Sequence, residues 1–363
     1  MIYVSANDLR VGMRLAKPIY NKNGVLLYDR NDKITKQGID SVRNFGLIGL
    51  YILEPAEPVP PMTEEEIEFE RFQTMGVYRI KEVLDAIMQD KTPENLMKLV
   101  DDIVRGYGDL YHKIIFTQNL RSPEDYTYKH ALNVAILVAL MSRRARLGIV
   151  EQNEIVIAAI LHDIGRLFLS PQLRGKSAEL DEEDIKQIKH GMLKGFDKIS
   201  YMIKIPAGVK RLVNQLYQLN YEEDSRQAFQ DAPTAVKIML VANTYDKYTA
   251  MQLGIPPHSE VAAIRKLQMN ETKYDKQIIK HLINSVKVLY PGVCIELSNH
   301  EKGLVLREND NDILRPMVLG FNHNKIYDLS DDVVFENLQI TDIMKTMDNR
   351  IKVDSERLKE YMQ

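Results

Sequence analysis

The sequence has few of the features that mark secreted, membrane-spanning and nucleic-acid-binding proteins. One cysteine, Cys294, stands among 363 residues, so no disulfide can form within the chain. No charged start followed by an apolar core marks a signal peptide, and we expect a protein of the reducing cytoplasm. The longest apolar stretch in a helical region, 134–141, falls short of the about 18 residues of a membrane span. Lysine and arginine total 48 against 51 acidic residues, which predicts no DNA partner.

The apolar pattern that is present indicates a mainly α protein with a small N-terminal α/β module and a small C-terminal β unit. A hydrophobic content of 45% over this length supports a sizeable core and two or three domains. The predicted parts are a β-rich module at 1–53, a proline-rich linker at 54–62, a helical connector at 63–120, a helical domain at 121–290, a β unit at 291–340 and a C-terminal helix at 341–363. Apolar stripes on the helices of the connector form a core or a dimer seam, so a homodimer is one prediction.

The strongest chemical signal lies in the stretch Ile155 to Arg166. A nearly uniform apolar helix is predicted to end at His162 and Asp163, and Gly165 then suits the left-handed turn that stops many helices. Neutral imidazole and carboxylate together can bind a divalent transition metal. The alternative is a helix end whose imidazole and carboxylate bond only to nearby backbone.

A second histidine, His130, lies on a helix predicted to begin near Ser122 and Pro123. The helix is apolar on nearly every face, so we expect it to be buried with His130 inside. A lone buried histidine is commonly a core residue without a ligand. An antiparallel neighbour ending in His162 and Asp163 would nevertheless bring the three side chains together.

Four segments resemble, in order and spacing, the HD-GYP branch of the HD phosphohydrolases over about residues 123–292. They are His130-Ala-Leu-Asn-Val-Ala135, Ala159-Ile-Leu-His-Asp-Ile-Gly-Arg166, Leu180-Asp-Glu-Glu-Asp-Ile-Lys-Gln-Ile-Lys189 and Val241-Ala-Asn-Thr-Tyr-Asp246. The resemblance implies an HD-type helical bundle that holds two or three iron or manganese ions. It also implies hydrolysis of the bacterial second messenger cyclic di-GMP.

The resemblance also implies roles for single residues. Asp163 would bridge two metals, whose bound water becomes the nucleophile toward phosphorus. Arg166, where the family usually has lysine, would contact a phosphate oxygen, although an ordinary surface cation near a helix end is the alternative. The implied metal ligands are His130, His162 and Asp163, with His190 and Asn243 as further candidates.

Two motif positions in the resemblance have lost an acidic residue. Tyr126 stands four residues before the first histidine, where the family has an acid, and this argues against a third metal. Asn243 replaces the metal-binding aspartate of the last segment, and a neutral amide is a weaker ligand. Asp246 remains at the second acidic position of that segment.

The histidines of the later motifs are also changed. The next family histidine would fall at Gly191, and His190 lies one residue early, which turns its side chain by about 100° around a helix. No histidine lies between His190 and His258, so the family's paired histidines are missing, as is the Gly-Tyr-Pro segment.

We therefore predict a degenerate, catalytically weak or silent HD-GYP protein that acts as a sensor or interaction module. Its partners would be cyclic di-GMP or another cyclic dinucleotide, or another protein. The alternative is an active metal-dependent phosphodiesterase with a rearranged site that uses His190, helped by Asp197 or Glu223. A third reading is a helical scaffold that binds neither metal nor nucleotide.

Overall fold

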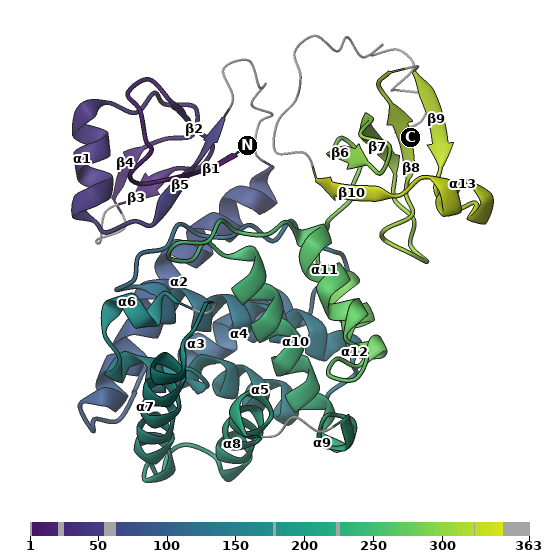
Figure 1. Cartoon of the computed structure of the whole chain (residues 1–363). Helices are drawn as coiled ribbons and strands as arrows, with labels where there is room; N and C mark the ends of the chain where they lie inside the picture. The colour runs from purple at the N-terminus through teal and green to yellow at the C-terminus, as the bar shows by residue number, and fades with distance from the viewer. Residues whose placement is uncertain are drawn as a thin grey trace.

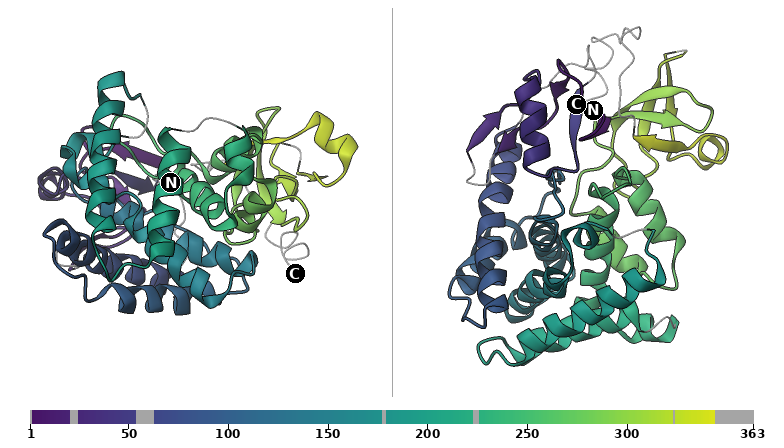
Figure 2. Two further views of the ribbon diagram at one scale, coloured as in Figure 1. Left: turned by 90° about the horizontal axis from the view of Figure 1, so that it is seen from below. Right: turned by 60° about the vertical axis from the view of Figure 1, so that its left-hand side comes forward.

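A helical bundle forms the middle of the chain, and two small β units lie at the same end of it (Figures 1 and 2). The computed structural model describes residues 2–20, 25–53, 63–176, 179–222, 226–322 and 324–343. The mainly α fold, with a small β unit before and after the helices in the sequence, is confirmed. The proline-rich linker predicted at 54–62 lies outside the described residues.

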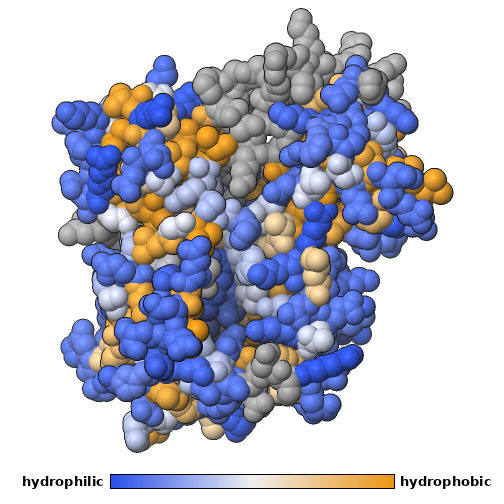
Figure 3. All heavy atoms as spheres, viewed as in Figure 1, coloured by the Kyte–Doolittle hydropathy of each residue, from blue (hydrophilic) through white to orange (hydrophobic). Residues whose placement is uncertain are grey.

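The N-terminal module has five short strands and one helix. Its elements are β1 (Ile2–Ser5), β2 (Arg14–Leu15), β3 (Ile19–Tyr20), β4 (Leu26–Tyr28), α1 (Lys36–Asn44) and β5 (Gly49–Leu53). Strand β5 pairs antiparallel with β1 and β2, and β3 pairs with β4. The Thr35 side chain caps α1 by accepting from the Gly38 amide, and α1 buries Ile39 and Val42 in a core of the module's own. The module still exposes apolar side chains, which Figure 3 shows in orange.

The bundle is built around α4 (Tyr126–Arg144), which contacts α2, α5, α10 and α12. Its burial is nearly complete, as the all-round apolar pattern predicted, and His130 is inside. The other helices of the bundle are α2 (Glu64–Met88), α3 (Leu96–Ile103), α5 (Ile149–Leu161), α6 (Pro171–Arg174), α7 (Glu182–Ser200), α8 (Ala207–Tyr221), α9 (Arg226–Asp231), α10 (Thr234–Thr249), α11 (Glu260–Met269) and α12 (Lys276–Ile283).

The apolar stripes of α2 and α3 pack inside the chain itself. Phe69, Ile80 and Leu84 of α2 and Leu99 of α3 belong to the main core, so the stripes have an intramolecular explanation. The homodimer stays a prediction without support from them. The predicted connector is not helical throughout, because α3 passes into one π-helical turn, Val104–Gly108, where two glycines weaken helical structure.

The turn after α5 corrects the prediction for Gly165. The chain continues through the His-Asp pair into a 3-10 helix, Ile164–Phe168, and Gly165 is not in the left-handed region. Glycine is needed there for close packing instead. A Cβ on Gly165 would lie 2.4 Å from the Cα of Met192 and 2.5 Å from the carbonyl oxygen of Gly191, so α7 contacts this turn backbone to backbone.

The C-terminal β unit is a five-stranded antiparallel sheet in the order β10-β6-β7-β8-β9. Its elements are β6 (Cys294–Leu297), β7 (Lys302–Arg307), β8 (Met317–Gly320), β9 (Lys325–Asp328), α13 (Asp332–Asn337) and β10 (Ile340–Ile343). The sequence placed a C-terminal helix at 341–363. Residues 341–343 are part of β10 instead, because they pair with β6, and 344–363 lie outside the described residues. Among the helices that the structure describes, none has the length and apolar character needed to cross a membrane.

Candidate metal site

Three of the predicted ligands meet in the core of the bundle. His130 comes from α4, and His162 and Asp163 come from the end of α5, so the packing of these two helices brings them together. One ligand atom from each lies within 4.8 Å of the others, and all three side chains are buried. The Nε2 atom of His130 is 3.5 Å from Asp163 Oδ2, and that of His162 is 3.7 Å from Asp163 Oδ1.

The orientation of His130 is fixed by Asp246 of α10. Its Nδ1 lies 2.6 Å from Asp246 Oδ2, and because an ionised carboxylate can only accept, Nδ1 carries the proton. Arg121 in turn binds both oxygens of Asp246, at 2.8 and 2.7 Å. Burial alone would raise the pKa of Asp246, but Arg121 and His130 hold it below its usual range. A carboxylate behind an imidazole is the usual support of a metal-binding histidine.

The orientation of His162 is fixed by a backbone carbonyl group instead of a carboxylate. Its Nδ1 donates to the carbonyl oxygen of Ala159 at 2.7 Å, which leaves a lone pair on Nε2. The two Nε2 atoms of His130 and His162 are 3.2 Å apart, and Asn243 Oδ1 lies 3.0 Å from Nε2 of His130. Two imidazole lone pairs, a carboxylate and an amide oxygen therefore converge. This donor set fits one divalent transition-metal ion, and it favours the metal reading over the capped-helix reading.

Both imidazoles are kept neutral in the folded protein. Burial lowers the pKa of His130 to about 4, although the nearby Asp246 opposes this shift. Burial likewise lowers the pKa of His162. Neutral imidazole is the form that binds a metal, so these ligands need not lose a proton at neutral pH.

Asp163 is already paired with cations of the protein. Its Oδ2 lies 3.2 Å from Nε of Arg166 and 3.4 Å from Nζ of Lys247. Burial alone would raise the pKa of Asp163, but Lys247, His162, Arg166 and His130 together lower it well below its usual range. The carboxylate is thus ionised, and two protein cations already lie beside its Oδ2.

The formal charge of the site is positive before any ion binds. Its two carboxylates face three protein cations, which gives a net charge of +1. The carboxylates are those of Asp163 and Asp246, and the cations are Arg121, Arg166 and Lys247. A first divalent ion raises this charge to +3, and a second has to bind against a strongly unfavourable potential.

Arg166 is not an ordinary surface cation, because it is buried. Its Nη1 donates to the carbonyl oxygen of Lys176 at 3.2 Å, and its Nε faces Asp163. Burial would lower the pKa of Arg166, but Tyr221 and Asp163 raise it. The side chain therefore stays charged at the edge of the site. Contact with a phosphate, expected from the resemblance, stays a prediction.

Helix α7 supplies none of the ligands proposed from it. His190 is exposed and does not join the cluster in this structure; one residue along, Gly191 faces the 3-10 turn. A Cβ on Gly191 would lie 2.9 Å from the carbonyl oxygen of Gly165, which leaves no room for a ligand side chain. Asp197 is also exposed on α7, and Glu223 lies outside the described residues.

Sequence reasoning missed Lys247 and Arg121. Lys247 directly follows Asp246, so its position beside a candidate acid was the one available signal. Arg121 lies in the irregular segment before α4, where no periodicity marks it. Its guanidinium stacks on Tyr126 at 4.9 Å from the ring centre, so a cation and an aromatic ring occupy the region where the family's acidic residue is expected.

A hollow in the molecular surface lies over α4, the helix that carries His130. Figure 3, in the view of Figure 1, shows this hollow over α4, between the side formed by α6 and α7 and the side formed by α10. These are the elements that carry or flank the cluster. His162 and Asp163 are 4% and 3% exposed, so little of either side chain is in contact with solvent.

Comparison with known proteins agrees with this architecture. Residues 127–205 match the HD domain family. The chain is 22% identical to the cyclic di-GMP phosphodiesterase PA4108 of Pseudomonas aeruginosa over 286 residues, which cover 75% of this chain and 67% of that relative. It is 23% identical to the cyclic di-GMP phosphodiesterase PdeB of Borreliella burgdorferi over 195 residues, 51% of this chain and half of that relative.

A solved structure was also found. Bd1817, described as an HDG"Y"P protein from Bdellovibrio bacteriovorus, matches with a TM-score of 0.46 and 15% identity over 77% of this chain and 97% of that chain. The family resemblance in the sequence is confirmed by the HD domain match and the two phosphodiesterase relatives. The cluster of His130, His162 and Asp163 lies on the helices of that domain and at their ends. Residues 127–205 therefore form an HD domain, and the chain is similar in sequence to two cyclic di-GMP phosphodiesterases.

Proposed function

We propose that this protein is a receptor in cyclic di-GMP signalling. It binds a cyclic dinucleotide at the HD cluster, or HD site, formed by His130, His162 and Asp163, and does not hydrolyse it. The relatives named as cyclic di-GMP phosphodiesterases support the ligand class. The pairing of Asp163 with Arg166 and Lys247 is the observation that carries the absence of hydrolysis. In a two-metal site this carboxylate would bridge both ions, and here two protein cations neutralise it.

The site offers ligands for one ion, either iron or manganese. His130, His162, Asp163 and Asn243 would hold it, and when bound it would polarise a phosphate oxygen. A second ion would need further histidines or acids. In the part of the chain that the structure describes, α7 presents Gly191 toward the site and turns His190 to solvent.

The protein cations suit the binding of an anionic phosphodiester. Arg166 and Lys247 border Asp163, and the net positive charge of the site attracts the two phosphates of a cyclic dinucleotide. Because both cations are held by buried contacts, their geometry is set before the ligand arrives. Preorganised charge favours tight binding, whereas turnover would also need an activated water nucleophile.

A second candidate is an active phosphodiesterase with a rearranged metal site. The neutral imidazoles of His130 and His162, each oriented through Nδ1, favour it, because they are ready to bind metal. This function would require α7 to move so that His190 reaches the cluster. The close contact of α7 with Gly165 opposes such a movement.

One experiment separates these functions. Protein purified without chelators would be analysed for metal content, for cyclic di-GMP binding by calorimetry, and for hydrolysis of cyclic di-GMP and its linear dinucleotide. We expect at most about one ion per chain, binding without turnover, and loss of binding in the His162→Ala, Asp163→Ala double variant. His190→Ala is the control and should match the wild type, since that side chain is exposed.

Two ions per chain, with turnover that the double variant abolishes, would replace this proposal by the phosphodiesterase. Absence of both metal and dinucleotide binding would support the third reading, a helical scaffold that binds neither. An effect of His190→Ala on turnover would show that α7 contributes a ligand in solution.

A further inference from the structure

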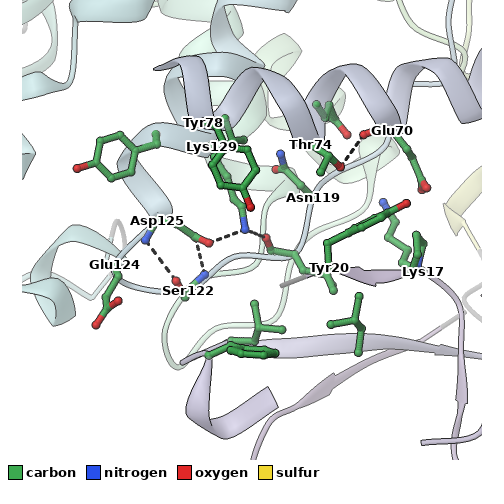
Figure 4. Close-up of a pocket in the computed structure, with 18 of the residues that line it drawn as sticks. Lys17, Tyr20, Glu70, Thr74, Tyr78, Asn119, Ser122, Glu124, Asp125 and Lys129 are labelled. Atoms are coloured by element: carbon green, nitrogen blue, oxygen red, sulfur yellow. Dashed lines mark hydrogen bonds and ion pairs between the residues drawn. The ribbon is translucent and has the colours of Figure 1, made fainter. Parts of the chain in front are cut away.

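A cavity of about 390 Å³ lies between the N-terminal module and the helical bundle, away from the HD cluster. One side is formed by β3 and the end of α1, and the other by α2, residues 118–125 and the start of α4 (Figure 4). Its volume falls within the range of about 300–1,000 Å³ that small-molecule sites occupy. The cavity is therefore large enough for a molecule the size of a nucleoside.

Aromatic rings line the cavity from both sides. Tyr20 and Phe45 belong to the module, and Tyr78 and Tyr128 to the bundle. Phe45 is 37% exposed, and Tyr128 is anchored by donating its hydroxyl to Asp85 at 2.7 Å. Rings presented from two parts with separate hydrophobic cores favour a flat ligand that stacks between or against them.

The charges that line the cavity cancel. Its charged residues are Lys17, Lys81, Lys129, Glu70, Glu124 and Asp125. Lys129 forms an ion pair of 2.5 Å with Asp125 at one end, whereas Lys17 and Glu70 lie at the other end, beside Tyr20 (Figure 4). With no excess of one sign, the cavity favours a neutral ligand over one with several phosphates.

Polar atoms in the lining are ready to contact a ligand. The Nδ2 atom of Asn119 is buried and has no hydrogen-bond partner within the described chain, so it can donate to a ligand carbonyl or ring nitrogen. The half-buried carboxylate of Glu70 can accept from a ring N–H or amino group. A buried unpaired amide costs stability unless water or a ligand satisfies it.

We propose that this cavity binds a neutral planar heteroaromatic compound of nucleoside size. The rings of Phe45 and Tyr78 stack on it, Asn119 donates to it and Glu70 accepts from it. The cavity is a second ligand site, distinct from the HD cluster in position and in charge. Its existence does not depend on whether the HD site binds or hydrolyses a cyclic dinucleotide.

Gln118 connects this cavity to the HD cluster. It lines the cavity, its carbonyl accepts from Lys17 of the module, and its Nε2 donates to Asp246 Oδ1 at 3.0 Å. Asp246 is the carboxylate that orients His130. A ligand in the cavity contacts a residue that is two hydrogen bonds from a candidate metal ligand, so its binding is relayed to the HD site.

Calorimetric titration of the full chain with guanosine, adenosine and uridine tests the binding site. We expect at least one nucleoside to bind below about 1 mM and the Phe45→Ala and Asn119→Ala variants to weaken binding at least about tenfold. Phe168→Ala is the matched control, because Phe168 has a similar exposure of 39% and does not line the cavity. The His162→Ala, Asp163→Ala double variant should bind the nucleoside as the wild type does.

Absence of binding by all three nucleosides at 1 mM, or binding lost only in the HD double variant, overturns the proposal. The relay is tested separately by nitrogen-15 NMR of the His130 imidazole. Its resonances should shift as the nucleoside saturates the wild type and stay unchanged in Gln118→Met. Unchanged His130 resonances at saturation of the wild type would overturn the relay.

Discussion

Gly165 and Gly191 contact each other through their backbones, since a Cβ on Gly165 would lie 2.5 Å from the carbonyl oxygen of Gly191. Gly195 extends this contact along α7, because a Cβ added to it would lie 2.5 Å from the Cα of Gly165. These two glycines of α7 are four residues apart and so share one helical face. The 3-10 helix that follows His162 and Asp163 packs against that face, and this packing fixes the distance between α7 and the HD cluster.

Substitution of Gly165 by alanine should destabilise the fold. The added methyl group would meet backbone atoms 2.4 to 2.5 Å away, and backbone cannot rotate aside as a side chain can. We expect the free energy of unfolding, from urea titration, to fall by about 1–3 kcal/mol, as for other overpacked cores. Gly106→Ala is the control, since its Cβ would have nothing within 4 Å. Equal stability of both variants would contradict the close contact.

Removal of the Lys247 charge should tighten metal binding. Its ammonium lies 3.4 Å from Asp163 Oδ2 and repels a divalent ion bound to that carboxylate. We expect Lys247→Met to lower the Kd for Mn²⁺ at least about tenfold, measured by electron paramagnetic resonance. Lys266→Met is the control, because Lys266 lies 4.0 Å from the ring centre of Tyr248 and forms no ion pair with the cluster. An unchanged Kd in Lys247→Met would mean that the ion does not bind at Asp163.

The stability of the metal-free protein should depend on pH through His130 and His162. Burial lowers the pKa of His130 to about 4 and also lowers that of His162, whereas unfolded imidazoles titrate near about 6.5. As the pH falls below about 6.5, the unfolded chain takes up protons first. The free energy of unfolding should then fall by up to about 1.4 kcal/mol per pH unit for each histidine.

Urea titrations between pH 8 and pH 4 would check this slope, with ionic strength held constant. His130→Asn removes one of the two titrating groups. The free energy of unfolding of this variant should therefore change less steeply with pH than that of the wild type, by an amount that corresponds to about one proton. If the variant and the wild type lost stability in parallel, His130 would not be the source of the dependence.

The buried pair of Arg121 and Asp246 should show strong energetic coupling. Arg121→Met leaves the carboxylate of Asp246 buried without its cation, which costs about 3–5 kcal/mol in such sites. Asp246→Asn likewise leaves the guanidinium of Arg121 buried without its carboxylate partner. The double variant should be less destabilised than the sum of the single variants, as measured by a double-mutant cycle in urea. Additive losses would show that the pair contributes no interaction energy.

Much of the fold was readable in the sequence, because long apolar patterns and helix caps are local signals. The burial of α4 followed from its all-round apolar pattern, and α2 begins where the helical connector was predicted to begin, at residue 63. The meeting of His130 with His162 and Asp163 followed from the order of the helices and the family resemblance.

What the sequence did not reveal depends on contacts between distant segments. The role of Gly165 was misjudged because a helix stop and a close backbone contact call for the same residue. Arg121 and Gln118 lie in an irregular segment, where no periodicity shows which side chains turn inward. The exposure of His190 required knowledge of how α7 is rotated against its neighbour.

The glycine contact between α7 and the 3-10 helix also bears on how this protein can evolve. A histidine introduced at position 191 would meet the Gly165 carbonyl oxygen and the side chain of Leu169 before it reached the cluster. A histidine at that position alone would damage packing without supplying a ligand. The return to a fuller coordination shell therefore requires the whole helix to shift together with its partner turn.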